Sequence, residues 1–189
     1  MTEEKKPFYI FKLCLIGAGA VGKTCIAKRL CFNSFDIDTK LTIGIDFYTY
    51  DIPAIVNGNK ENIRLSIWDF GGQEQFKKLF HYYINGANGI LMVFSLIDIQ
   101  TLVGLDWWYD KLVEYKQQNT PKALVGTKND LIKKIDKKDG LIIKNFQKRY
   151  SEKHFFKTSS KDNVNIKETF IEMTKNILEK NNLDYDKLG

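Results

Sequence analysis

A glycine-rich segment near the start of the chain has the residue types needed to bind phosphate. It reads Gly17-Ala18-Gly19-Ala20-Val21-Gly22-Lys23-Thr24 and fills every fixed position of the pattern G-x-x-x-x-G-K-[ST]. Glycines let such a loop turn its backbone N–H groups inward, Lys23 supplies a point charge, and the Thr24 hydroxyl is a hard ligand suited to Mg²⁺. An apolar run precedes the segment and a helical pattern follows it, which is the context this motif requires. The segment therefore predicts a polyphosphate site.

Later residues have the chemistry to complete a site around a terminal phosphate. Thr42 lies in a polar loop, and Asp69 ends an apolar run that reads as a strand. Both could hold a metal ion, Thr42 by its hydroxyl and Asp69 through water. Gly72 could offer a backbone N–H, and the neutral amide of Gln73 could orient an attacking water. Taken singly, Thr42, Asp69 and Gln73 could be a strand-edge threonine, a turn or cap residue and a solvated side chain. Their order after the phosphate loop favours a functional role for all three.

Two more segments follow predicted strands, and with them a family resemblance becomes specific. They read Gly126-Thr127-Lys128-Asn129-Asp130 and Lys157-Thr158-Ser159-Ser160-Lys161. The ordered set GAGAVGKT, LTIG, DFGGQE, TKND and TSSK resembles the Ras superfamily of small GTPases from Phe8 to the last predicted helix. The resemblance implies a molecular switch that cycles between GTP and GDP and hydrolyses GTP slowly. The phosphoryl-transfer mechanism is carried over from Ras by similarity.

The resemblance also implies residue roles in a guanine pocket. Asp130 would accept hydrogen bonds from guanine, Lys128 would lie along the base, and Thr127 replaces the usual Asn, as in the Rho branch. The expected nucleotide-binding residues are Gly19, Ala20, Val21, Gly22, Lys23, Thr24, Cys25, Phe35, Thr42, Gly72, Thr127, Lys128, Asp130, Ser159, Ser160 and Lys161. The expected Mg²⁺ ligands are Thr24, Thr42 and Asp69, and the expected catalytic residue is Gln73.

Within the superfamily the chain looks most like the Rab branch. Ile43-Gly44-Ile45-Asp46-Phe47 and the aromatic set Phe47, Trp68 and Tyr83 carry this likeness, whereas Gly71 resembles the Arf pattern and Leu41 replaces the usual proline. The likeness implies effector proteins that bind through Thr39–Phe47 and Phe70–Tyr83, a GTPase-activating protein, an exchange factor, and signalling of the vesicle- or membrane-traffic type.

The elements that would position these residues follow an alternating pattern. Apolar runs at Tyr9–Ile16, Leu65–Asp69, Gly89–Leu96 and Lys122–Thr127 alternate with stretches of helical period. A tight reversal at Asn57-Gly58 predicts a hairpin between residues 46–56 and 62–69. We expect an α/β fold of the P-loop NTPase type: a three-layer sandwich whose six-stranded, mostly parallel sheet has one antiparallel edge strand and helices on both faces.

Apolar stripes predict several of the helices. Residues 22–32 follow the first strand, and Leu102, Leu105, Trp108, Tyr109 and Leu112 share one helical face. Ile166, Phe170, Met173 and Ile177 form a stripe near the end. We expect one small GTPase domain over residues 8–180, with flexible tails at 1–7 and 181–189.

Composition narrows the class of protein. The 189 residues are 43% hydrophobic and 28% charged, which is typical of a folded globular domain. The net charge of +6 comes from scattered lysines with no basic run interleaved with aromatics, so no nucleic-acid partner is expected. Three cysteines without C-x-x-C spacing favour a reducing, cytoplasmic location. Thr2 and the ending Asp-Lys-Leu-Gly offer no lipid anchor in this chain, so peripheral membrane association would need a partner or a missing tail.

Two other functions remain open at this stage. A scaffold could hold nucleotide constitutively without cycling, although Gln73, Asp69 and Thr42 argue against it. An ATPase would use the same phosphate loop, and the phosphate loop alone does not choose a base.

Overall fold

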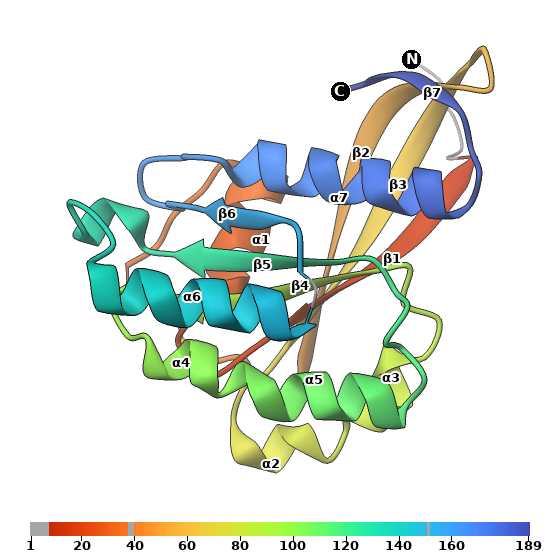
Figure 1. Ribbon diagram of the computed structural model, residues 1–189. Helices are drawn as coiled ribbons and strands as arrows, with labels where there is room; N and C mark the ends of the chain where they lie inside the picture. Colours follow the sequence, from red (N-terminus) through yellow and green to blue (C-terminus); the bar gives the residue numbers. More distant parts are fainter. Residues whose placement is uncertain (1–7, 38–39, 151) are drawn as a thin grey trace.

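The computed structural model describes residues 8–37, 40–150 and 152–189, which form a seven-stranded sheet with helices on both faces (Figure 1). The strands are β1 (Tyr9–Ile16), β2 (Ile45–Val56), β3 (Asn59–Phe70), β4 (Gly89–Ser95), β5 (Lys122–Thr127), β6 (Phe155–Lys157) and β7 (Tyr185–Leu188). The helices are α1 (Lys23–Phe32), α2 (Glu74–Lys77), α3 (Phe80–Ile84), α4 (Gln100–Val103), α5 (Leu105–Glu114), α6 (Lys137–Tyr150) and α7 (Ile166–Lys180), with a 3₁₀ turn η1 (Asn129–Leu131). The spatial order of the strands is β6-β5-β4-β1-β3-β2-β7.

The middle of the sheet is parallel, as the apolar runs predict. β1 pairs in parallel with β3 and β4, and β5 pairs in parallel with β4 and β6. Every residue of β4 is buried, because helices cover both faces of the strand. The carboxyl ends of β1, β3, β4 and β5 therefore meet at one edge of the sheet, where the loops that carry the predicted functional residues begin.

β2 and β3 form the predicted antiparallel hairpin. Its turn is Asn57-Gly58, where both residues have positive φ, 49° and 77°. This backbone suits asparagine and glycine and matches the twist of the flanking strands. β2 begins one residue earlier than predicted. β3 begins three residues earlier, because the polar residues Asn59, Lys60 and Glu61 still pair with β2.

The expected fold class is confirmed, but the strand count is wrong by one. Tyr185–Leu188, within the expected flexible tail, form β7 and pair antiparallel with Ala54–Val56. Leu183, Tyr185 and Leu188 pack partly buried against the core, and the backbone N–H of Asn57 donates to the carbonyl of Asp184 at 2.8 Å. β2 thus runs opposite to the other six strands of the described sheet, and it lies inside the sheet between β3 and β7 instead of at the expected edge. This segment is mostly polar and β7 itself partly buries only Tyr185 and Leu188, so no strong signal of a strand is present in the sequence.

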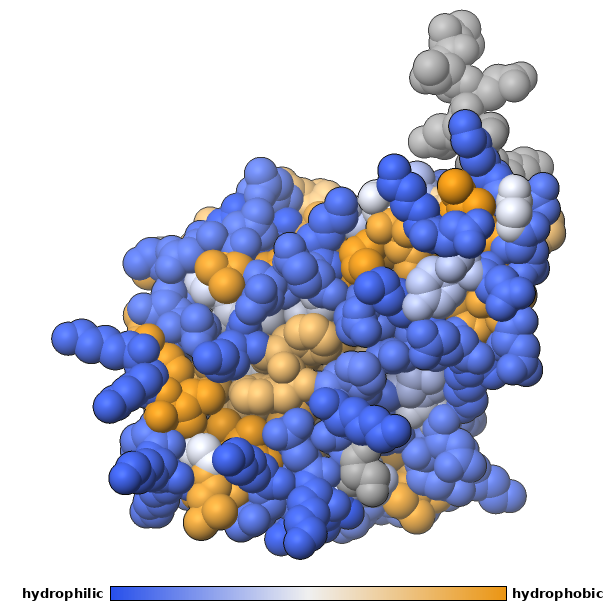
Figure 2. All heavy atoms as spheres, turned by 45° about the horizontal axis from the view of Figure 1, so that its top comes forward, coloured by the Kyte–Doolittle hydropathy of each residue, from blue (hydrophilic) through white to orange (hydrophobic). Residues whose placement is uncertain are grey.

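Two apolar layers hold the helices on the sheet. α1 and α7 cover one face, where Ile26, Phe170 and Met173 are buried against β1 and β3. α3, α5 and α6 cover the other face, with Trp108 and Phe146 buried there. The face on which α7 and the hairpin come forward is mostly hydrophilic with a few separate hydrophobic patches (Figure 2).

The helix predicted from Leu102 to Leu112 is divided in two. α4 ends at Val103 and α5 begins at Leu105, with Gly104 between them. Leu102, Leu105, Trp108 and Leu112 are buried as expected. Tyr109 is only partly buried. In the described residues no helix is long and apolar enough to span a bilayer.

Candidate functional site

The phosphate loop joins β1 to α1 and has the backbone that its glycines permit. Gly17, Ala20 and Gly22 have positive φ of 142°, 59° and 103°. At Gly17 a side chain is excluded, since a Cβ would lie 2.1 Å from the carbonyl oxygen of Val93 on β4. The loop is therefore pressed against the sheet, and its N–H groups and the N-terminus of α1 are available to an anion.

Lys23 is buried within this loop. Its Nζ donates hydrogen bonds to the carbonyls of Gly17 and Ala18 at 3.0 and 2.6 Å. Burial lowers the pKa of Lys23 to about 8, although the Asp69 carboxylate acts in the opposite direction. A buried ammonium of this kind is stabilised by an added negative charge, which a phosphate would supply.

Three oxygen-bearing side chains meet beside the loop. The Thr24 hydroxyl donates to Asp69 Oδ2 and lies 2.9 Å from the Thr42 hydroxyl, which is 3.4 Å from the same carboxylate oxygen. Burial raises the pKa of Asp69 to about 6, while the hydrogen bond from Thr24 acts the other way. These are the residues predicted to hold Mg²⁺, and they come together from α1, the loop before β2 and the end of β3.

The donor set fits a hard divalent cation. Asp69 Oδ1 is buried and has no hydrogen-bond partner among the described residues, which leaves a carboxylate oxygen to be satisfied by a ligand. The described residues contain no cluster of three or more His, Cys, Asp and Glu. A metal here would therefore depend on hydroxyl, carboxylate and substrate oxygens, as Mg²⁺ commonly does.

Gly71 and Gly72 allow the loop after β3 to lie against the phosphate loop and the loop before β2. A Cβ on Gly72 would lie 2.2 Å from the carbonyl carbon of Ala18 and 2.4 Å from the backbone nitrogen of Gly19. A Cβ on Gly71 would lie 2.7 Å from the carbonyl oxygen of Thr42, and the Gly71 N–H donates to Gly44 at 2.8 Å. Gly71 thus has a physical reason to be glycine, because a side chain would not fit in this arrangement.

Gln73 follows directly. Its Cγ would lie 3.9 Å from a Cβ on Gly19, and its Oε1 accepts a hydrogen bond from Gln75 at 3.2 Å. The Gln73 side chain therefore lies beside the phosphate loop, while its amide oxygen faces Gln75.

The predicted base pocket is built from two loops tied to each other. The Ser159 hydroxyl donates to the Asp130 carboxylate at 2.7 Å, and Lys128 Nζ donates to the carbonyl of Ala20 at 2.9 Å. The buried Thr127 hydroxyl donates to the carbonyl of Val21. These bonds hold the base loops against the phosphate loop.

Arg29 was missed by the sequence analysis. Its guanidinium donates to the carbonyls of Ser160 and Lys161 at 2.6 and 3.2 Å and so ties α1 to the loop before α7. Because the partners are more than 130 positions apart, no local pattern could reveal this contact.

One pocket of about 410 Å³ connects these parts. Of the predicted nucleotide-binding residues it is lined by Gly19, Ala20, Gly22, Lys23, Thr24, Cys25, Phe35, Thr42, Gly72, Thr127, Lys128, Asp130, Ser160 and Lys161, and also by Gln73. Val21, Ser159 and Asp69 are buried behind its wall. Asp36, Ile37, Lys40, Leu41, Ile97 and Leu131 also line it and were not predicted. Thr39, at the start of an expected partner segment, lies outside the described residues.

Comparison with known proteins gives a consistent result. A family model described as Ras family matches residues 12–179. The Ras-related protein Rab-10 of Diplobatis ommata is 33% identical over 174 residues, which cover 90% of this chain and 82% of that protein. RABD2b of Arabidopsis thaliana is 33% identical over 169 residues, which cover 88% of this chain and 79% of that protein. The GTP-binding protein ypt1 of Schizosaccharomyces pombe is 30% identical over 177 residues, which cover 91% of this chain and 82% of that protein.

Proposed function

Since the chain belongs to the Ras family and resembles the Rab branch most, we propose that it is a Rab-like switch. Bound Mg²⁺·GTP holds the loops of Thr42 and Gly72 in place, and hydrolysis of GTP releases them. Guanine-nucleotide binding and GTPase activity follow from the family. The proposal for this chain rests on one observation: the phosphate loop, the loops of Thr42 and Gly72, and the base loops all line the same pocket.

The phosphate end of the pocket is assigned to the loop and its neighbours. Backbone N–H groups from Gly19 to Thr24 and the ammonium of Lys23 would bind the phosphates. Thr24, Thr42 and Asp69 would hold Mg²⁺, which supplies neutralisation of charge on the phosphate oxygens. The buried Oδ1 of Asp69, which has no hydrogen-bond partner among the described residues, supports this assignment.

Gln73 is assigned to hydrolysis. Its amide can accept from and donate to a water at the same time, and little covalent chemistry is otherwise required of the protein. The Gln73 side chain lies close to Gly19, from where it could reach a water beside the terminal phosphate.

The base end would select guanine. Asp130 presents a carboxylate to a donor pair that adenine lacks, and Ser159 fixes the orientation of that carboxylate. Phe35 lines the same pocket and would pack against the base.

An activating partner would have to supply an arginine. The sequence has three arginines, Arg29, Arg64 and Arg149. Arg29 is bonded to backbone carbonyls, and the other two pair with Asp51 and Asp106. The proposal therefore includes a GTPase-activating protein that inserts an arginine near Gly19. It also includes an exchange factor that promotes release of GDP.

The proposed effector surface lies beside the two loops. Phe47 contacts Trp68 at 4.7 Å between ring centroids, and Trp68 contacts Tyr83 at 5.9 Å. Phe47 is 59% exposed and Ile43 is 82% exposed, which leaves an apolar patch for a partner. By resemblance to the Rab branch, we extend the proposal to membrane-traffic signalling, with association at a membrane through a partner or an added anchor.

Single-turnover hydrolysis tests the proposal. Purified protein loaded with GTP and Mg²⁺ should release phosphate slowly, and Gln73→Leu should reduce that rate strongly while GTP stays bound. Gln118→Leu, which changes an exposed glutamine outside the pocket, is the matched control and should behave as wild type. Wild-type turnover in Gln73→Leu would refute the catalytic assignment, and no phosphate release from wild type over many hours would favour the scaffold.

Competition between nucleotides tests the base assignment. Excess GTP should displace bound fluorescent GDP and excess ATP should not, and Asp130→Asn should weaken GDP binding. An ATPase would show the opposite preference, and Asp130→Asn would leave its nucleotide binding unchanged.

A further inference from the structure

The segment that carries Gln73 is closed at its two ends by aromatic packing. Phe70, the last residue of β3, and Phe80, the first of α3, are both buried, and their rings meet edge-to-face at 5.5 Å. The intervening segment therefore starts and ends at fixed points. Gln73 and α2 lie within it, and their placement depends on contacts made between those points.

α2 has little packing of its own. None of its residues Glu74–Lys77, all described, is buried, and a helix this short is not stable by backbone hydrogen bonds alone. A hollow of about 400 Å³, lined in part by Gln75, Lys77 and Trp107, lies between α2 and α5. The helix is thus not fixed by an apolar core beneath it.

Lys77 makes the contact that crosses this hollow. Its Nζ lies 4.3 Å from the centroid of the Trp107 ring on α5, within the range of a cation–π interaction. The same amino group pairs with Glu74 at 2.7 Å, and the Lys77 side chain is only 20% exposed. One lysine therefore closes the turn of α2 and joins it to α5.

Trp107 is itself in contact with the buried aromatic residues. Its ring meets Trp108 edge-to-face at 5.0 Å, and the buried Trp108 meets Phe80 edge-to-face, also at 5.0 Å. Phe80 in turn contacts Phe70. A continuous row of rings thus runs from the end of β3 through α3 to α5, and Lys77 links the far end of that row back to α2.

We propose that Trp107 is a positioning residue for GTP hydrolysis, because its ring holds Lys77 and thereby holds α2 with Gln73 directly before it. The inference rests on the proposed role of Gln73. Trp107 does not line the nucleotide pocket, so its contribution should appear in the hydrolysis rate and not in nucleotide binding. A cation–π pair of this exposure corresponds to a change of about twofold to fivefold in rate.

A double-mutant cycle tests the link. Trp107→Leu keeps apolar bulk and Lys77→Met keeps the stem, and each should slow single-turnover hydrolysis about twofold to fivefold. The double variant should be no slower than either single one, because the same interaction is removed. Trp107→Phe and Lys77→Arg keep an aromatic face and a cation, so both should retain most of the wild-type rate. GDP dissociation should be unchanged throughout.

Controls separate this role from general stability. Lys144→Met removes an exposed lysine from α6 and should leave the hydrolysis rate unchanged. A wild-type rate in Trp107→Leu and Lys77→Met, or fully additive effects in the double variant, would overturn the inference while the proposed function stands. If Trp107→Leu does not fold, Lys77→Met and its rescue by Lys77→Arg still test the inference. No hydrolysis by wild type would overturn both.

Discussion

The Thr127 hydroxyl donates a hydrogen bond to the carbonyl oxygen of Val21, 106 positions earlier in the chain. Its oxygen also lies 3.1 Å from the carbonyl of Phe94 on β4, and Thr127 is buried. Thr127 therefore joins the base loop, the phosphate loop and the sheet.

Loss of this hydroxyl should loosen the nucleotide pocket. Thr127→Val keeps the shape and removes the donor, so the free energy of unfolding should fall by about 1–2 kcal/mol. GDP should dissociate several-fold faster, because the phosphate loop is no longer tied to the base loop. Urea unfolding and release of a fluorescent GDP measure the two effects. Thr49→Val, an exposed threonine on β2, is the control, and unchanged GDP release in Thr127→Val would contradict the role.

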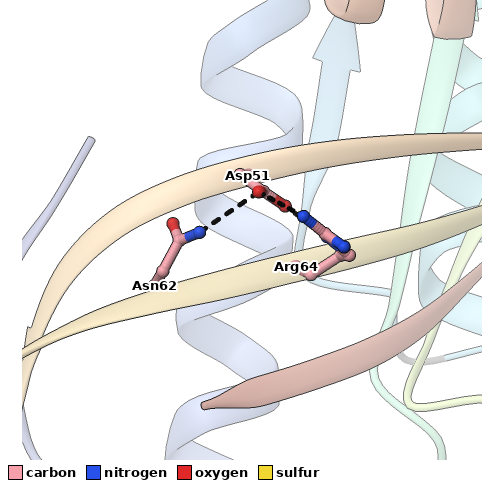
Figure 3. A network of polar contacts seen from close by, with 3 residues as sticks. All are labelled: Asp51, Asn62 and Arg64. Atoms are coloured by element: carbon pink, nitrogen blue, oxygen red, sulfur yellow. Dashed lines mark hydrogen bonds and ion pairs between the residues drawn. The ribbon is translucent and has the colours of Figure 1, made fainter. Parts of the chain in front are cut away.

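The outer face of the hairpin should contribute stability that depends on pH. Arg64 donates two hydrogen bonds of 2.7 Å to the Asp51 carboxylate, and Asn62 donates a third at 3.1 Å (Figure 3). The hydrogen bonds from Arg64 chiefly lower the pKa of Asp51 below its ordinary 3.8. Because the folded pKa is the lower one, the contribution is complete above about pH 4 and is lost as the pH falls through the folded pKa.

The pair is more than a third exposed, so its contribution should be small. Asp51→Asn should cost about 0.2–1 kcal/mol at pH 6, and this cost should shrink as the pH falls below about 4. Urea unfolding of both proteins across this range measures the difference, and added salt should reduce it. Asp110→Asn, on the exposed side of α5, reports the effect of removing a negative charge in general. A difference that grows on acidification would contradict the linkage.

Removal of β7 should destabilise the domain and open the edge of β2. Deletion of residues 183–189 removes three partly buried apolar side chains and the hydrogen bond from the Gly189 N–H to the Pro53 carbonyl. We expect a loss of about 1–3 kcal/mol and self-association that rises with concentration, because an unpaired strand edge can pair with another chain. Thermal unfolding and sedimentation measure these effects. Lys187→Ala, an exposed residue of β7, should change neither, and a monomeric truncated protein of unchanged stability would refute the role.

The thiol of Cys14 should report global unfolding. Cys14 is fully buried, and burial raises the pKa of its thiol to about 12. Since the thiolate is the reactive form, native protein should not be alkylated there at pH 8. The labelling rate, followed by mass spectrometry, should rise with urea in parallel with loss of helical circular dichroism. Rapid labelling of Cys14 in native protein would contradict its burial.

The sequence by itself determined the first strand, the hairpin turn and the phosphate loop. Strong signals such as the run Tyr9–Ile16, the Asn57-Gly58 turn and the segment Gly17–Thr24 depend on near neighbours, and the structure has β1, the hairpin turn and the phosphate loop at those residues. These features follow from backbone preference and side-chain period, which a single segment carries.

Only the tertiary structure decided which distant groups complete one another. β7, the Arg29 contacts with the loop before α7, and the Lys77–Trp107 link all join segments with no local pattern to announce them. The reason is physical: a partly polar strand or a lone cation is stabilised by the partner it meets after folding. The same holds for Gly71, whose missing side chain is explained by the carbonyl of Thr42 that would lie 2.7 Å from a Cβ.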